Sequence, residues 1–267
     1  MSGISTATVA RAATTTPVGR MRALARAELT LLGRTKGTLF AALFVPLAMP
    51  FSLRQVADSM DLKGNGLSIG AVVVPGAIGF SLLFAVYSAL VTVFAARREE
   101  LVLKRLRTGE LRDPEILAGA ALPSVAIGLT QCVVLAIACA ALLDAGAPSA
   151  PHLAVIGVLL GLVMFGALGA VTASFSRSVE SAQVMAMPLT FASMFGSGLF
   201  VPFEVMPDKL AAVCELLPLS PVITLVRGGW TGELSGAETL GALATAVAWT
   251  VVSVFAVRRW FRWEPRR

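Results

Sequence analysis

The residues best suited to chemistry lie together in one short stretch, RREELVLKRLRTGELRDPEIL, at 97–117. This stretch contains six of the 22 basic residues and five of the 16 acidic residues, and more than twenty uncharged residues flank it on either side. Its acids alternate with bases and do not gather into the carboxylate or histidine cluster that acid–base catalysis requires. Such a mixture favours a surface that docks against another protein, because complementary charges set the register and specificity of an interface.

The residues needed for other kinds of site are missing from the sequence. None of the four lysines is followed by Ser or Thr, so the chain has no G-x-x-x-x-G-K-[ST] phosphate loop and is not its own P-loop ATPase. The cysteines Cys132, Cys139 and Cys214 do not have the spacing of a metal site, and His152 is the single histidine. We therefore expect no catalytic residue, no metal and no cofactor bound by this chain.

Composition indicates an all-α integral membrane protein. Apolar residues make up 56% of the 267, charged residues only 14%, and the mean hydropathy is +0.80. A soluble domain carries about 25% charged residues, whereas uncharged apolar runs of about 20 residues can cross the hydrocarbon layer as helices. The charged residues divide the chain into a bundle of six expected spans, at 37–53, 70–96, 116–143, 153–176, 181–202 and 239–257.

The distribution of Lys and Arg predicts the side of the membrane that each loop faces. Eighteen of the 22 lie in the segment up to Lys36, in the loop 97–115, at Arg177 and in the tail after Val257, and only four lie in the alternate loops. Positively charged loops stay in the cytoplasm, so we expect both termini and the charged stretch there. The net charge of +6 thus reflects topology and not a nucleic-acid surface. Abundant Arg and Ala favour a bacterial cytoplasmic membrane.

The segments that precede and separate the spans have different expected structures. Residues 1–19 are expected to be a flexible cytoplasmic tail, 20–36 an amphipathic helix lying among the lipid headgroups, and 258–267 a basic tail. The stretch 97–109 is expected to form a cytoplasmic helix of about three turns from Arg97 to Arg107, held between two spans. Its alternative is a solvated loop with ordinary flanking charge. The apolar residues that share one side of this helix are Val102, Leu103 and Leu106.

The longest outer segment, 203–228, is predicted to contain two short helices that form a re-entrant or surface-lying lid. The first runs from about Asp208 to Leu217, where Pro218 ends it. The second runs from Ser220 to Arg227, with Ser220 as N-cap and proline in its first turn. It is expected to end at Gly228-Gly229.

Small and polar residues inside the expected spans allow two interpretations. Gly157 and Gly161 form a GxxxG pair, which favours close helix packing over a ligand site. No acidic or basic residue lies mid-membrane, which argues against an ion-coupled transporter, although carbonyls and hydroxyls alone can hold Na⁺. The uncharged polar side chains that either bond across helices or line a substrate path are Tyr87, Thr92, Gln131 and Gln183.

Two stretches resemble the ABC-2 type membrane permeases of ATP-binding-cassette exporters. REELVLKRLRTGELRDPEILAG at 98–119 is similar to the charged start, L-K-R-L-R run, small turn and P-x-x-I-L of that family. SGLFVPFEVMPDKLAAVCELLPLSPVITLVRG at 197–228 is similar to its fifth-span exit, outer helix and L-x-P-L-[ST] turn. The six-span topology agrees over essentially the whole chain, without the added outer domain of large members.

The resemblance implies partners and contact residues. Two permease copies, identical or paired with a sister subunit, would assemble with two cytoplasmic ATPases that carry ATP and Mg²⁺. The 97–109 helix would be the coupling helix, with Leu103 or Leu106 as its buried anchor. The outer residues that would shape the exit are Pro218, Ser220, Pro221 and Arg227. The ATPase-coupling interface would comprise Glu99, Glu100, Val102, Leu103, Lys104, Arg105, Leu106, Arg107, Thr108, Gly109, Arg177 and Glu180.

The expected function is therefore that of an export permease driven by a separate ATPase. Its uncharged spans favour a hydrophobic or amphipathic substrate, such as a drug, an antibiotic or a lipid, over a sugar polymer. Two alternatives stay open: an ion-coupled secondary transporter, and a non-transporting immunity or sensory protein on the same scaffold. A membrane enzyme is disfavoured because no cluster of His, Asp or Glu marks a membrane edge.

Overall fold

The structure covers the chain from the second expected span onward. Apart from a few single residues, the parts that the computed structural model describes are 69–108, 112–142, 146–200 and 206–261. Residues 1–18 of the expected tail, most of the interfacial helix 20–36 and of the span 37–53, and Gly109 lie outside the described residues.

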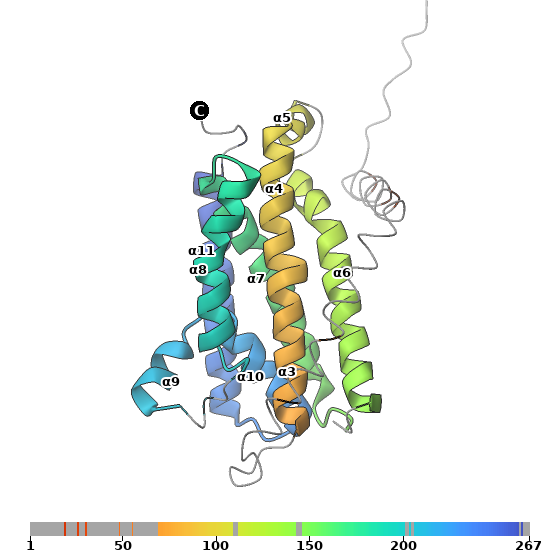
Figure 1. The fold of residues 1–267 in the computed structure, drawn as a ribbon, viewed down its shortest axis with the longest axis vertical. Coiled ribbons are helices and arrows are strands. Elements are labelled where there is room, and N and C mark those ends of the chain that lie inside the picture. The colour runs from red at the N-terminus through yellow and green to blue at the C-terminus, as the bar shows by residue number, and fades with distance from the viewer. Residues whose placement is uncertain are drawn as a thin grey trace, which may run out of the picture.

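The described residues form a bundle of long helices with short helices at both ends, and no strand occurs among them (Figure 1). The long helices run roughly along the long axis of the molecule. The elements in chain order are α3 (Ile69–Ser81), the π-helix η1 (Leu82–Ser88), α4 (Ala89–Glu99), α5 (Val102–Arg107), α6 (Asp113–Leu142), α7 (Pro151–Phe175), α8 (Val179–Gly196), α9 (Asp208–Cys214), α10 (Ser220–Thr231) and α11 (Gly236–Trp260).

Four helices in the described part of the chain are long and apolar enough to cross a membrane: Val72–Glu99, Asp113–Leu142, Pro151–Phe175 and Gly236–Trp260. The first of these is α3, η1 and α4 in one continuous rod. The shorter α8 has 18 residues, begins at Val179 and carries the charged Glu180 in its first turn. Of the six expected spans, the first and fifth thus stay predictions.

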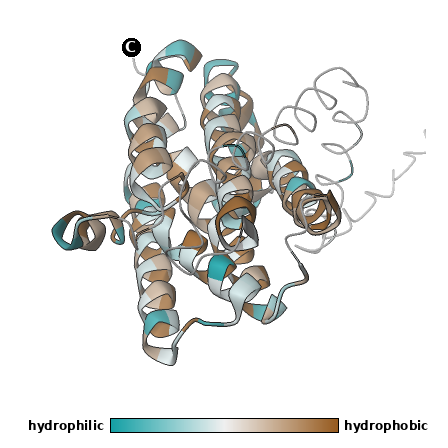
Figure 2. Ribbon diagram, turned by 60° about the horizontal axis from the view of Figure 1, so that its bottom comes forward, coloured by the Kyte–Doolittle hydropathy of each residue, from teal (hydrophilic) through white to brown (hydrophobic). Residues whose placement is uncertain are grey.

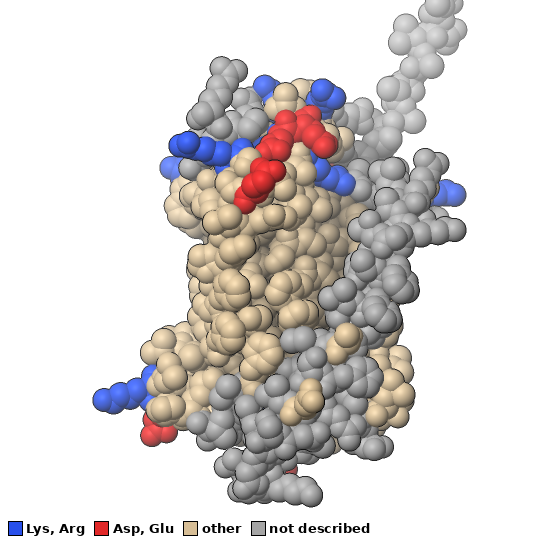
Figure 3. Space-filling view, in the orientation of Figure 1, with Lys and Arg blue, Asp and Glu red and all other residues tan. Residues whose placement is uncertain are grey.

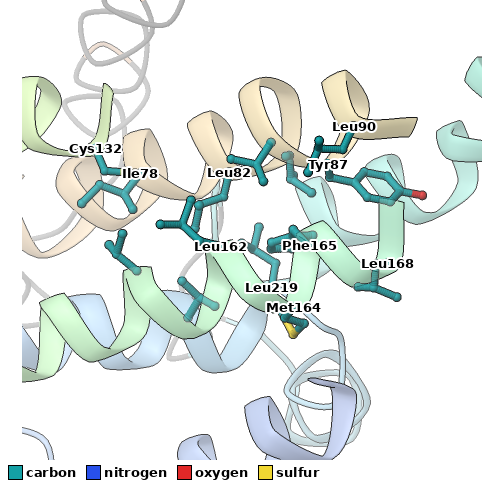
Figure 4. Close-up of a cluster of buried hydrophobic side chains, with 14 of the residues drawn as sticks. Ile78, Leu82, Tyr87, Leu90, Cys132, Leu162, Met164, Phe165, Leu168 and Leu219 are labelled. Atoms are coloured by element: carbon teal, nitrogen blue, oxygen red, sulfur yellow. The ribbon is translucent and has the colours of Figure 1, made fainter. Parts of the chain in front are cut away.

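Helix α7 is the central element of the bundle. It packs against η1, α4, α10 and α11, and the buried side chains of α3, η1 and α7 meet in one cluster (Figure 4). Glycines allow the close approach: a Cβ on Gly157 would lie 3.0 Å from Leu225 Cβ, and one on Gly161 would lie 2.8 Å from Leu82 Cδ1. Small residues at helix contacts provide packing where lipid supplies no hydrophobic drive.

Polar and apolar residues are separated along the bundle axis. Charged side chains gather at the end that carries α5, a smaller group lies at the opposite end, and a broad uncharged band separates them (Figure 3). The hydropathy of the ribbons likewise shows polar residues near the helix ends (Figure 2). An uncharged band between two charged ends is what an integral membrane protein requires.

The two short helices between α8 and α11 differ in extent from the sequence prediction. Helix α9 ends at Cys214 and not at Leu217. Helix α10 does not end at Gly228-Gly229 but continues to Thr231, and the left-handed residue that ends it is Gly232, with φ 77°. The glycine pair serves close packing instead, since a Cβ on Gly229 would lie 2.6 Å from Ala154 N.

Helix α8 also ends earlier than the expected 181–202. Its last residue is Gly196, and Gly198 follows in the left-handed region with φ 73°. Glycine occupies that region without the steric penalty of a side chain, so the chain turns there toward α9. A Cβ on Gly196 would lie 2.5 Å from Leu217 Cδ1, so the turn packs closely on the outer segment.

Candidate functional site

The sequence predicted one helix of three turns in the charged stretch, but the structure divides this stretch between two helices. Helix α4 continues to Glu99, and the chain then breaks at Leu101, whose φ of 58° and ψ of 16° are left-handed. A non-glycine residue in this region costs about 1–2 kcal/mol. The break starts a separate helix, α5, that is six residues long. Arg97 to Glu99 therefore belong to the end of the long helix.

Helix α5 has one face in the bundle and one face outside it. Leu103 is fully buried, with 0% of its surface exposed, and belongs to the main hydrophobic core. Leu106 is half-buried against that core. The Leu103 side chain thus anchors α5 to its own chain, and the expectation that Leu103 or Leu106 anchors an ATPase stays a prediction. The residues exposed around α5 are Glu100, Leu101, Lys104, Arg105, Arg107 and Thr108, with Val102 half-buried.

Contacts of Arg107 and Thr108 hold the C-terminal end of α5. The Arg107 guanidinium donates from Nε to Asp113 Oδ1 at 3.0 Å, and it lies 4.9 Å from the centre of the Trp263 ring. The Thr108 hydroxyl donates to the Arg105 carbonyl at 2.7 Å, which satisfies a carbonyl of the last turn. Exposed ion pairs contribute about 0–1 kcal/mol, so these contacts orient α5 more than they stabilise the fold.

The end of α4 that precedes α5 is held by Arg98, which the sequence analysis did not single out. This side chain is only 1% exposed. It donates from Nη1 to the Ala173 carbonyl at 2.6 Å, and from Nη2 to the Ser176 carbonyl at 2.7 Å and the Ser176 hydroxyl at 3.0 Å. A buried charge is tolerated when it is hydrogen-bonded in this way. Arg98 thus joins the end of α4 to the end of α7.

Glu99 makes the neighbouring contact to the start of α8. Its Oε1 accepts from the Val179 backbone N–H at 2.9 Å. Ser178 caps the same helix, accepting from the Ser181 N–H at 3.2 Å while the Ser181 hydroxyl accepts from the Ser178 N–H at 2.8 Å. The turn between α7 and α8 is therefore fixed from two sides.

The same turn presents the second predicted contact. Arg177 and Glu180 are both exposed, at the end of the bundle that carries α5. Hydrogen bonds from its own backbone N–H and from the Ser178 hydroxyl lower the pKa of the Glu180 carboxyl below its ordinary value. The structure thus brings α5 and the Arg177–Glu180 turn to one end of the molecule, linked through Arg98 and Glu99.

The helical period of the sequence contained a signal for Arg98. Arg98 follows Ala95, Phe94 and Val91 at spacings of three, four and seven, and all three are buried. Residues at these spacings share a helix face, so the apolar face of α4 ends in an arginine that points inward. The density of charge around it concealed this pattern.

Three of the four polar residues considered for a substrate path make contacts within the bundle. Gln131 is 1% exposed and its Oε1 accepts from the Ser81 hydroxyl at 2.7 Å. The Tyr87 and Thr172 hydroxyl oxygens lie 3.0 Å apart. The Thr92 hydroxyl donates to the Ser88 carbonyl of its own helix at 3.0 Å. Only Gln183, on α8, is exposed.

The outer residues of the prediction hold the α9–α10 segment against the bundle. Pro218, Ser220 and Pro221 are buried. The Ser220 hydroxyl donates back to the Cys214 carbonyl and so does not cap α10 as predicted. Arg227 donates from Nη2 to the Gly198 carbonyl at 3.3 Å, which links α10 to the chain leaving α8. Trp249 Nε1 donates to the Leu216 carbonyl at 2.8 Å and links this segment to α11.

Two apolar cavities lie on the α6 side of α7. One of about 360 Å³ is near the α10 end and includes Cys132, Val155 and Trp230 in its wall. The other, of about 680 Å³, lies between α6, α7 and α11 and has Asp113 and Arg258 at its rim. Within the described residues, no group of His, Cys, Asp or Glu is arranged to hold a metal ion.

Comparison with known proteins identifies the family. The family model described as "ABC-2 type transporter" matches residues 20–230, which include α5, the Arg177–Glu180 turn and the segment 203–228. A comparison with curated proteins returned no match. Because the family model covers well over half of the 267 residues, the chain belongs to the ABC-2 type transporter family.

Proposed function

We propose that this ABC transporter permease is an export subunit driven by two copies of a separate cytoplasmic ATPase. The observation that carries the proposal is the form of α5. It is a short helix whose apolar Leu103 is locked into the core while Glu100, Lys104 and Arg105 remain exposed. A helix held by its own chain on one face and charged on the other is suited to receive a partner and to transmit its movement.

The mechanism follows from this attachment. ATP and Mg²⁺ bind to the ATPase and close it, and the closure displaces α5 together with the Arg177–Glu180 turn. Both elements continue directly into long helices, so the displacement shifts the equilibrium between two arrangements of the bundle. The charged residues around α5 set the register of docking. Leu106, half-buried at the edge of the core, offers an apolar contact beside the exposed Leu101.

A second permease copy is part of this proposal. Helix α8 exposes Gln183, Met187, Phe191 and Phe195, which are spaced four residues apart and thus follow one side of the helix. The Phe191 and Phe195 rings stack with their centres 6.3 Å apart. Lipid alone would cover the apolar residues, but an amide such as Gln183 is better placed against a polar partner in another helix. We therefore place the second copy, and the substrate path between the copies, on this face.

The substrate proposed is hydrophobic or amphipathic, such as a drug, an antibiotic or a lipid. Its support is the uncharged character of the spans and of the exposed α8 face, on which Met187, Phe191 and Phe195 are apolar and Gln183 is polar but uncharged. Among alternatives, an ion-coupled transporter commonly carries an ionisable residue inside a span, although carbonyls and hydroxyls alone can hold Na⁺. Among the described residues Arg98 is a deeply buried cation, but its hydrogen bonds to the end of α7 indicate a structural role and not ion coupling. A non-transporting sensory protein would bind an ATPase without export.

The first test is affinity purification of the tagged chain from membranes of its host in mild detergent. A co-purifying soluble protein with a phosphate loop, at about one copy per permease, supports the proposal. Elution without any ATPase, even after trapping with ATP and vanadate, refutes it.

The second test uses charge reversal on α5. The pair Lys104→Glu and Arg105→Glu should release the ATPase because both side chains face out, while insertion into the membrane is retained. Lys209→Glu, at the opposite end of the molecule, is the matched control and should keep the ATPase bound. Retention of the ATPase by the double variant would contradict docking on α5.

A further inference from the structure

Arg98 and Glu99 are adjacent residues that bind the two helix ends on either side of one turn. Arg98 holds the end of α7 and Glu99 holds the start of α8. We propose that this Arg98–Glu99 joint makes α5 and the α7–α8 turn one rigid unit, so that force applied to α5 reaches α7 and α8 together. The proposal rests on the proposed function, since it is the ATPase that applies the force.

The chemistry of Arg98 suits the end of a helix. The last carbonyls of α7 lack the usual partner four residues on, and the helix dipole places partial negative charge there. The Ala173 carbonyl accepts from the Ser176 N–H at 3.3 Å and the Ser176 hydroxyl at 2.7 Å, and Arg98 adds a charged donor to it. The two terminal nitrogens of Arg98 reach carbonyls three residues apart, at Ala173 and Ser176. A planar guanidinium presents several donors in a fixed fork, whereas the ammonium of lysine is a single point of charge. The contact is therefore specific for arginine.

Glu99 completes the joint with the opposite charge. The N–H groups at the start of α8 lack partners within the helix, and the dipole there is positive. The Glu99 carboxylate accepts from one of them, at Val179. Arg98 binds the negative end of the α7 dipole, and Glu99 binds the positive end of the α8 dipole. Rotation of the α7–α8 turn relative to α4 would therefore break both contacts. The turn and the end of α4, from which α5 departs at Leu101, can then move only as one body.

The rigid unit continues through α7 to the other end of the bundle. There α7 packs closely on α10, where Gly157 faces Leu225 and Gly229 faces Ala154. Arg98 is 1% exposed and so lies out of reach of an ATPase docked on α5. We assign it as a positioning residue that links the docking surface to α7 and thereby to α10.

The first experiment tests the joint without the ATPase. Spin labels at Arg105→Cys and Arg177→Cys, both exposed, report the distance from α5 to the turn in lipid nanodiscs. The native cysteines in the described chain are buried, so labelling favours the introduced pair. We expect one narrow distance distribution in the otherwise unchanged chain. Arg98→Gln should give a broad distribution, Arg98→Lys an intermediate one, and Glu100→Gln, an exposed neighbour, no change.

The second experiment tests transmission in the complex with the co-purified ATPase, using unlabelled chains. Trapping with ATP and vanadate should change hydrogen exchange in α10 of the unchanged permease. In Arg98→Gln the ATPase should still co-purify, because Arg98 is outside the docking surface. The α10 response to trapping should fall about tenfold, which is within the range of energetic coupling between distant sites.

The outcomes separate the joint from the proposed function. Glu99→Ala provides a milder second variant, should Arg98→Gln fail to fold, since Glu99 is exposed and alanine removes the acceptor of the Val179 N–H. Narrow distributions in both variants, or an undiminished α10 response, would overturn the joint. Failure of any ATPase to bind the unchanged permease would overturn the proposed function and with it the transmission of force. A broad distribution and a lost α10 response with the ATPase still bound would establish both.

Discussion

The contact between α7 and α10 should make Gly229→Ala destabilising, although alanine is the better helix former. A Cβ at this position would lie 2.6 Å from the backbone N of Ala154, 2.8 Å from its Cβ and 3.0 Å from its Cα. Two of these atoms belong to the backbone of α7 and cannot rotate away. Overpacking of this kind costs about 1–3 kcal/mol, and the helix preference for alanine returns about 1 kcal/mol. Because backbone atoms obstruct the added Cβ, the upper part of the overpacking range applies, about 2–3 kcal/mol, which leaves a net loss of about 1–2 kcal/mol.

The assay is the apparent unfolding midpoint of the purified protein in one detergent, measured at one heating rate because membrane proteins often unfold irreversibly. For chains of about this size, each kcal/mol changes the midpoint by about 2–4 °C, so Gly229→Ala should lower it by several degrees. Gly241→Ala is the matched control. It lies within α11, where an added Cβ would meet nothing within 4 Å, and its midpoint should stay the same or rise.

A midpoint for Gly229→Ala equal to or above that of Gly241→Ala would refute the reasoning. It would mean that α10 can move away from α7 at no cost. The close approach of these two helices would then not hold the outer segment in place, and the transmission from α7 to α10 proposed above would lose its structural basis.

Three further substitutions test single contacts. Leu101→Gly should raise the unfolding midpoint by a few degrees, because glycine removes a left-handed strain of about 1–2 kcal/mol, and an unchanged or lower midpoint would show that the strain is absent. Trp249→Phe removes the bond to the Leu216 carbonyl and should speed limited proteolysis of the α9–α10 segment, whereas equal cleavage rates would exclude that role. Tyr87→Phe removes the contact with Thr172 and should cost about 0.6 kcal/mol, the average for such bonds in membranes, without changing export. Loss of export at normal stability would instead place Tyr87 on the substrate path.

The long helices were the part of the structure that the sequence could predict. Helices α6 and α7 run over Asp113–Leu142 and Pro151–Phe175, against the expected 116–143 and 153–176. Charged residues bound each apolar run, and the cost of burying a charge in lipid is large enough to decide where a span ends. That rule depends only on local composition, so it can be applied without knowing what packs where.

The short elements depended on contacts that composition does not reveal. Gly228-Gly229 has the form of a helix end, yet α10 continues through it because the pair lies against Leu234 and Ala154. Leu103 and Leu106 share an apolar side, but only the structure shows that Leu103 is used by the core of its own chain. Glycine can end a helix or allow close packing, and a leucine beside charged residues can bind a partner or pack in its own core. The sequence pattern predicted the first use in both cases, whereas the tertiary contacts show the second.

Two local rules are broken within four residues at the junction of α4 and α5. Arg98 is a charged residue in a buried position, and Leu101 is a branched residue in the left-handed region. Each departure costs free energy, and such strain persists only where the surrounding structure over-determines it. A solvated loop that merely displayed charges would need neither, because α4 could simply fray into water. The strained turn and the buried arginine instead fix the direction in which α5 leaves the long helix. That direction is the property a helix needs if a partner is to move the bundle by pressing on it.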